Sequence, residues 1–143
     1  MKVGITSKVE VVFNAPASRV WKALTDPAEV KQYLFGTNMS VSKWEVGGSI
    51  SYKGEWEGKQ YEDKGKILKY IPEKLLVTSY WSGMSGKPDL PENYQIVSYE
   101  LTPANGGTKL TITQDNVASE EGKKHSEDNW GMVLKGMKKL IEG

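Results

Sequence analysis

The chain has 143 residues, of which 38% are hydrophobic and 26% are charged, so its composition is that of a globular protein. Lysine and arginine together number 19 against 18 acidic residues, and Arg19 is the only arginine, which argues against nucleic acid as a partner. Cysteine is absent and His125 is the one histidine, which excludes thiolate chemistry and the usual zinc ligand sets. We therefore expect no cofactor and no metal.

The length predicts one domain over residues 1–143, because a chain of this size buries enough surface for one core and leaves no room for a second. Residues 1–8 lack the apolar run of a signal peptide. No stretch approaches the roughly 20 apolar residues of a membrane span. The sequence therefore predicts a cytoplasmic protein with no membrane span.

The first predicted elements are a strand over residues 3–13 and two short helices after it. Pro16 or Ser18 opens the first helix. Asp26 and Pro27 end that helix and start the second one, which runs through Tyr33. The sequence thus opens with the order strand, helix, helix.

Six further strands are predicted between turn signals rich in glycine, proline and asparagine. They cover residues 41–46, 50–57, 61–71, 75–81, 94–101 and 109–116. The short connections predict an antiparallel meander. A long helix closes the chain, and its apolar positions recur at helical spacing. These positions are Trp130, Val133, Leu134, Met137, Leu140 and Ile141.

The alternation of side chains along each strand predicts which residues face the helix. The expected inward sets are Ile50, Tyr52, Gly54 and Trp56; Leu75, Val77, Ser79 and Trp81; Val97, Tyr99 and Leu101; and Leu110, Ile112 and Gln114. In residues 61–71 the pattern changes phase, which indicates a bulge near Lys66 or Leu68. In that register Asp63 faces the interior, whereas a slip of one residue turns it to solvent beside Lys64, and we favour the slip.

Several motifs in a fixed order resemble one family over nearly the whole chain. They are the sequence VWKALTDP at residues 20–27, Gly47-Gly48, Gly65 with Pro72 and Leu75, VSYELTP at 97–103, GTKL at 107–110, and the terminal helix from Trp130 to Leu140. In this order they resemble the family of homologues of the activator of heat-shock-chaperone ATPase, in the START/Bet v-like (SRPBCC) superfamily.

The resemblance implies an α+β helix-grip fold, in which a curved antiparallel sheet of about six or seven strands grips the C-terminal helix and two short helices plug one end. It also implies a choice of functions, because members include co-chaperone domains and carriers of hydrophobic ligands. A curved sheet around one helix tends to leave a cavity, so we expect a small apolar or amphipathic molecule as the ligand.

The residues expected to line this cavity lie on strands, on the C-terminal helix or in the long connection over residues 82–93, and all except Met84 are aromatic or polar. They are Trp56, Tyr61, Asp63, Trp81, Met84, Gln114 and Trp130. No residue is predicted to be catalytic, because no pair of base and nucleophile is present. Two alternatives remain. One is a protein-interaction module that binds a heat-shock chaperone and stimulates its ATPase, and the other is a cyclase or hydrolase in which Asp63 titrates.

Overall fold

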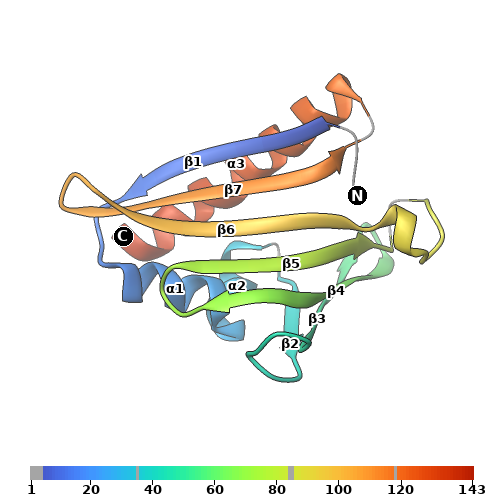
Figure 1. Ribbon diagram of the computed structural model, residues 1–143, viewed down its shortest axis with the longest axis horizontal. Coiled ribbons are helices and arrows are strands. Elements are labelled where there is room, and N and C mark those ends of the chain that lie inside the picture. The colour runs from blue at the N-terminus through green and yellow to red at the C-terminus, as the bar shows by residue number, and fades with distance from the viewer. Residues whose placement is uncertain (1–4, 35, 84–85, 118) are drawn as a thin grey trace.

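The computed structural model describes residues 5–34, 36–83, 86–117 and 119–143. These residues form three helices and one curved sheet (Figure 1). In chain order the elements are β1 (Ile5–Phe13), α1 (Ala17–Thr25), α2 (Pro27–Tyr33), β2 (Asn38–Val41), β3 (Ser49–Trp56), β4 (Lys59–Ile71), β5 (Leu75–Ser82), the 3₁₀ turn η1 (Pro91–Asn93), β6 (Gln95–Ala104), β7 (Gly107–Val117) and α3 (Glu120–Glu142).

The described strands form one seven-stranded sheet in the order β1-β7-β6-β5-β4-β3-β2. Every neighbouring pair is antiparallel, and the first strand of the chain pairs with the last. In Figure 1 the three helices lie behind the sheet, so one face of the sheet is covered and the other faces the viewer. The predicted α+β helix-grip fold is confirmed.

The long helix α3 begins and packs as its sequence predicts. Ser119 caps its N-terminus, since the Oγ atom accepts a hydrogen bond from the Gly122 amide at 3.0 Å. The apolar stripe faces inward, and Val133, Leu134 and Met137 are buried. This burial is what holds the helix against the sheet, because a single helix gains little stability from its own hydrogen bonds.

Side chains of α3 also bind backbone groups of β1, which is an edge strand of the sheet. Glu127 accepts a hydrogen bond from the Lys8 amide at 3.0 Å, and Glu142 accepts one from the Asn14 amide at 2.9 Å. Lys138 donates to the Val12 carbonyl at 2.7 Å. These contacts use backbone groups that would otherwise stay open for pairing with another strand.

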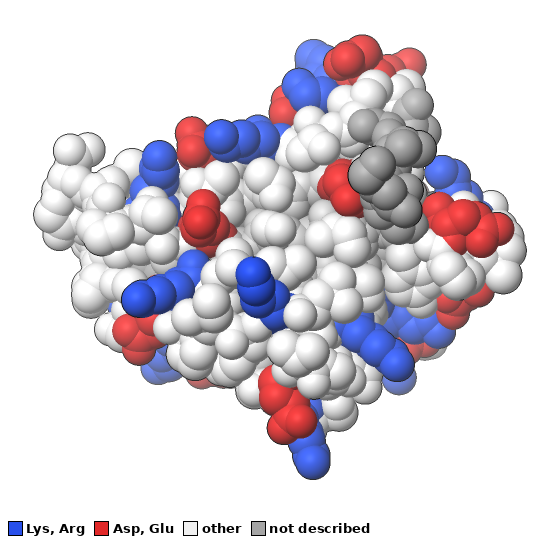
Figure 2. Space-filling view, in the orientation of Figure 1, with Lys and Arg blue, Asp and Glu red and all other residues white. Residues whose placement is uncertain are grey.

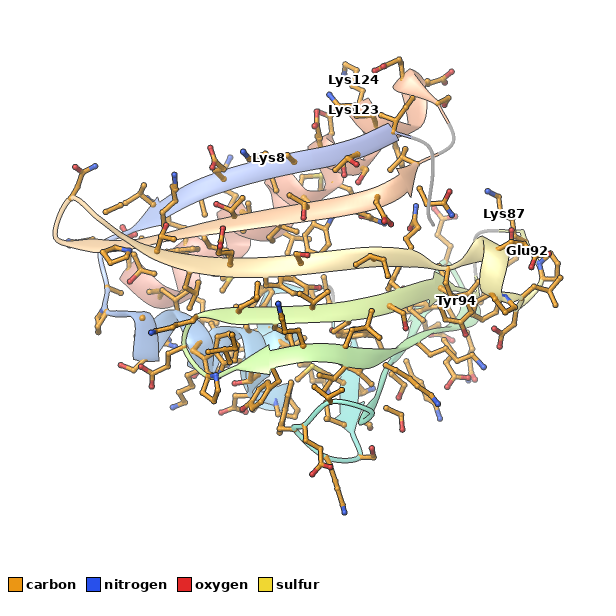
Figure 3. The ribbon with its side chains drawn as sticks, viewed as in Figure 1. Lys8, Lys87, Glu92, Tyr94, Lys123 and Lys124 are labelled. Atoms are coloured by element: carbon orange, nitrogen blue, oxygen red, sulfur yellow. The ribbon has the colours of Figure 1, made fainter. Side chains whose placement is uncertain are left out.

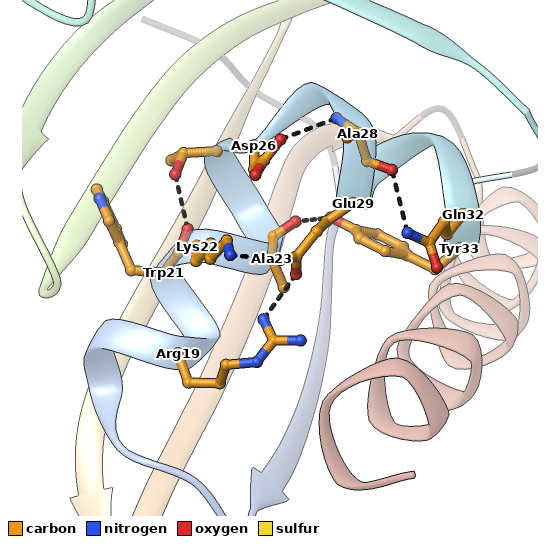
Figure 4. A network of polar contacts seen from close by, with 10 residues as sticks. Arg19, Trp21, Lys22, Ala23, Asp26, Ala28, Glu29, Gln32 and Tyr33 are labelled. Carbon is orange, nitrogen blue, oxygen red and sulfur yellow. Dashed lines mark hydrogen bonds and ion pairs between the residues drawn. The ribbon is translucent and has the colours of Figure 1, made fainter.

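A polar network fastens α1 to α2 at the end of the sheet that follows β1 (Figure 4). The Arg19 guanidinium lies 2.6 Å from Glu29 Oε1, and Lys22 Nζ lies 3.4 Å from Glu29 Oε2. The Tyr33 hydroxyl donates to the Ala23 carbonyl at 2.8 Å. The one arginine of the chain therefore holds a helix pair together.

The hydrophobic core is densest beneath this helix pair. Its fully or nearly fully buried members include Phe13, Val20, Ala23, Ile67, Leu76, Val97, Leu110, Ile112 and Met137. They come from α1, from the inner face of the sheet and from α3, so this end of the molecule is closed by packed side chains.

Two details of the strand prediction were tested by the structure. The strand expected over residues 41–46 is wrong, because β2 ends at Val41 and the chain then turns back through a hydrogen bond from the Gly48 amide to the Glu45 carbonyl at 2.9 Å. The expected bulge is confirmed, since the register between β4 and β5 shifts between Ile67 and Lys69.

The prediction for the inward face of β5 is wrong. Leu76 and Thr78 are buried, at 2% and 4% exposure, and Tyr80 packs against the core, so the set that includes Leu75 and Val77 faces outward. Both faces of this strand carry apolar residues, and alternation alone therefore gave no sign of which face is buried.

Candidate functional site

The inner face of the sheet changes from apolar to polar along its length. Below α1 and α2 it presents buried aliphatic side chains such as Leu101 and Leu110. Toward the opposite end, where α3 begins and β5 joins β6, it presents mainly tyrosines, amides and one carboxylate. These inward residues are Tyr52, Asp63, Tyr80, Gln95, Tyr99 and Gln114. We call this group the polar inner face.

Asp63 lies on the polar inner face with its two carboxylate oxygens in different situations. Oδ2 accepts a hydrogen bond from the Tyr80 hydroxyl at 2.8 Å. Oδ1 is buried and has no hydrogen-bond partner in the part of the chain that the structure describes. Asp63 therefore faces the interior, and the favoured register that turned it to solvent is wrong.

The tyrosines around this carboxylate are held as neutral phenols. Burial raises the pKa of Tyr52 to about 12, with a further increase from the charge of Asp63. Burial likewise raises the pKa of Tyr80 and Tyr99 well above the usual value for a phenol. The Tyr99 side chain lowers the pKa of Tyr52 in part, so these two residues on β3 and β6 lie close together across the concave face, which shows how strongly the sheet curves.

Gln114 connects the polar inner face to α3. Its Oε1 atom accepts hydrogen bonds from Trp130 Nε1 at 2.9 Å and from Ser126 Oγ at 3.2 Å, and its Nε2 atom donates to Gln95 Oε1. The Trp130 ring meets the Tyr99 ring edge to face, with centroids 6.0 Å apart. Gln114 and Trp130, two predicted site residues, are therefore in direct contact.

Tyr61 and Trp81 lie apart from this contact. The Tyr61 hydroxyl shares a hydrogen bond of 2.6 Å with Thr37 Oγ1. Trp81 lies on the outer face of β5, where its Nε1 atom donates to the Lys87 carbonyl at 3.2 Å and Lys64 Nζ lies 5.6 Å from the ring centroid. The prediction that Trp81 faces the interior is thus wrong. The Trp56 side chain and Met84 lie outside the described residues.

The sequence analysis does not identify Tyr80 and Gln95 as members of the polar inner face. The inward set predicted for residues 75–81 omits Tyr80, and the set predicted for residues 94–101 begins at Val97 and omits Gln95. The signal that identifies Tyr80 is its parity with Leu76 on the same strand, since both side chains point to the core.

A hollow, which we call the outer groove, lies along the line where α3 meets the edge strand β1. It is an open groove of about 410 Å³ with a mainly apolar lining. The residues that line it are Val9, Glu10, Val11, Gly131, Leu134, Lys135 and Lys138.

The described residues contain no helix long and apolar enough to cross a membrane. Within the same residues, no three side chains of the metal-binding types gather closely enough to hold a metal ion.

Comparison with known proteins gives the family. The family model described as "Activator of Hsp90 ATPase homolog 1-like protein" matches residues 14–142. The chain belongs to this family. The family resemblance seen in the sequence is thereby confirmed. A search of curated proteins found no match.

Solved structures of relatives have the same fold. ChR145 from Cytophaga hutchinsonii, known from a solution structure, is 46% identical in sequence to the present chain. The two structures have a TM-score of 0.85, and the match covers 99% of this chain and 97% of ChR145. CV1439 from Chromobacterium violaceum is 23% identical, with a TM-score of 0.80 over 96% and 97% of the two chains. The Aha1 dimer from Colwellia psychrerythraea is 20% identical, with a TM-score of 0.73 over 97% of each chain.

Proposed function

We propose that this protein binds a small amphipathic molecule between the concave face of the sheet and α3, without chemical turnover. The observation that carries the proposal is the position of Tyr52 and Tyr99. Both lie deep enough for burial to raise their pKa, yet both keep part of their surface accessible. Side chains that lie this deep and keep some accessible surface are within reach of a small molecule on the concave face.

The chemistry of the polar inner face suits such a ligand. Aromatic rings offer apolar surface, while Asp63, Gln95 and Gln114 offer a few polar atoms that fix orientation. The opposite end is closed by the packed helices α1 and α2, so a ligand enters from the end where α3 begins. The apolar part of an amphipathic ligand can therefore contact the aromatic rings while its polar group binds the nearby polar atoms.

The test combines identification of the ligand with its location. Native mass spectrometry of the purified protein, followed by extraction, detects a copurified small molecule. Nuclear magnetic resonance then follows the indole and backbone N–H signals while the apolar probe N-phenylnaphthylamine is added. We expect the Trp130 signal to shift and the Trp81 signal, on the outer face, to stay in place. Shifts confined to Trp81, or to Glu10 and Lys135 in the outer groove, would contradict the proposal.

The family description supplies a second candidate function, which is contact with a heat-shock chaperone. The match covers residues 14–142 and is described by activation of the Hsp90 ATPase. The test is a direct ATPase assay of the chaperone from the same organism with and without this protein. Stimulation that survives filling of the interior by N-phenylnaphthylamine indicates a surface interaction, separate from ligand binding.

A further inference from the structure

Asp63 Oδ1 is a buried polar atom on the inner face that has no partner among the described residues. Buried carboxylate oxygens are nearly always hydrogen-bonded, because an unmet acceptor keeps its full cost of leaving water. Tyr80 satisfies Oδ2 alone, at 2.8 Å, and Oδ1 has no partner among the described residues. A carboxylate in this position is prepared for a donor that comes from outside the chain.

No described lysine or arginine forms an ion pair with Asp63. The adjacent Lys64 is directed to the outer face, where its Nζ atom lies 2.6 Å from Asp89. The described groups that interact electrostatically with Asp63 are the hydroxyls of Tyr52 and Tyr80. Both phenols are neutral, so no described positive charge lies against the Asp63 side chain.

The surface at the open end does not oppose a cation either. Figure 3 shows Lys123 and Lys124 at the start of α3, on the side of the molecule where Lys87 and Tyr94 lie. Lys123 pairs with Glu127 at 3.4 Å, and Lys124 pairs with Asp128 at 3.0 Å, so the charges of these two lysines are largely balanced. On the face shown in Figure 2, basic and acidic side chains are likewise interspersed.

We propose that Asp63 anchors an amphipathic amine, whose protonated nitrogen donates to Oδ1 while its apolar body lies against the rings of the polar inner face. This inference rests on the proposed function and names the chemical class of its ligand. The amine supplies both a hydrogen-bond donor and the missing positive charge. Tyrosine rings nearby also attract a cation through their faces. An alcohol of the same shape supplies only the donor, and a carboxylate supplies neither.

Three probes of matched shape test the charge requirement: phenylbutylamine, phenylbutanol and phenylbutyrate. Isothermal titration calorimetry at about pH 7, where the amine is protonated, measures their affinities. We expect the amine to bind the protein about tenfold or more tightly than the alcohol, because hydrogen bonds between charged groups are about twice as strong as neutral ones. The carboxylate should bind most weakly.

Two variants assign the preference to one atom pair. In Asp63→Asn the amine should lose its advantage over the alcohol, while the matched control Asp128→Asn, on the exposed face of α3, should keep it. Tyr80→Phe removes the competing donor, so the amine should bind this variant at least as tightly as the original protein. Thermal unfolding confirms that each variant is folded before its affinities are compared.

The outcomes separate the two proposals. Equal affinity for amine and alcohol, or an amine preference that persists in Asp63→Asn, overturns the amine anchor while small-molecule binding stands. Binding of none of the three probes, together with no small molecule in the extract of the purified protein, overturns the proposed function as well.

Discussion

Replacing Trp130 by Phe and Gln114 by Leu, singly and together, measures how firmly α3 is fastened to the polar half of the sheet. Trp130→Phe keeps an aromatic ring next to Tyr99 but removes the donor that lies 2.9 Å from Gln114 Oε1. Gln114→Leu keeps a side chain of similar length but removes the acceptor shared by Trp130 and Ser126.

The expected magnitudes follow from the number of partners lost. Trp130→Phe removes one hydrogen bond and should lower the free energy of unfolding by about 1 kcal/mol. Gln114→Leu leaves the Trp130 donor and the Gln95 acceptor unmet, while Ser126 keeps its hydrogen bond with Ser7 Oγ at 3.0 Å. The variant should cost about 2–3 kcal/mol, because the two unmet groups are only partly buried. The double variant should show a coupling of about 1 kcal/mol, since the shared bond is lost only once.

Urea denaturation of the four proteins, followed by circular dichroism, gives the coupling. Trp81→Phe combined with Gln114→Leu is the control, because the Trp81 indole bonds the Lys87 carbonyl on the outer face and should show no coupling. A Trp130–Gln114 coupling below about 0.3 kcal/mol, which is the usual limit of additivity, would refute the idea that this bond ties helix to sheet.

Three other variants test separate parts of the structure. Gly65→Ala should lower the free energy of unfolding by about 1–3 kcal/mol in urea, because a β-carbon there would overlap the Ser79 carbonyl, and unchanged stability would contradict that close approach. The hydrogen bond from the Asn14 amide lowers the pKa of Glu142. The stabilising effect of this hydrogen bond is therefore present above about pH 4.5 and is lost as the pH falls further. Glu142→Gln should make the melting temperature less sensitive to acid in that range. Burial raises the pKa of Tyr52 to about 12, so Tyr52→Phe should remove absorbance change near that pH and leave the change near pH 10 intact, and it should also weaken the loss of stability as pH rises from 10 to 12.

The closed end of the molecule was predictable from sequence because its signals are local. Asp26 caps α2 by accepting a hydrogen bond from the Ala28 amide at 2.9 Å, and Pro27 occupies the first turn, as expected for this pair of residues. The stripe on α3 needed only helical spacing to be recognised. Caps, prolines and periodicity depend on neighbours in the chain, and one sequence contains all of that information.

The polar inner face was harder to predict, because its residues meet across strands. The contact of Gln114 with Trp130 depends on how α3 lies on β7, and the contact of Asp63 with Tyr80 depends on the register of β4 against β5. A bulge at Leu68 lies between the cleanly paired parts of that register. The sequence shows the bulge as a break in the alternation of apolar and polar side chains along β4. It does not show how β5 pairs with β4 on either side of that break.

The polar inner face departs from the rule that buried positions carry apolar side chains, and that departure favours a functional role. Sequences that only need to fold place aliphatic side chains toward a helix, as this chain does at Leu101 and Leu110. At the other end of the same strands the chain places the amides of Gln95 and Gln114 inward. On β4 it places Asp63 inward, with Oδ1 lacking a partner among the described residues. Stability alone gives no reason for that arrangement, because apolar residues of the same size would avoid the cost of an unmet buried acceptor. Retaining the carboxylate is understandable if a ligand supplies the missing donor, which is why the response of amine affinity to Asp63→Asn bears on the purpose of the whole interior.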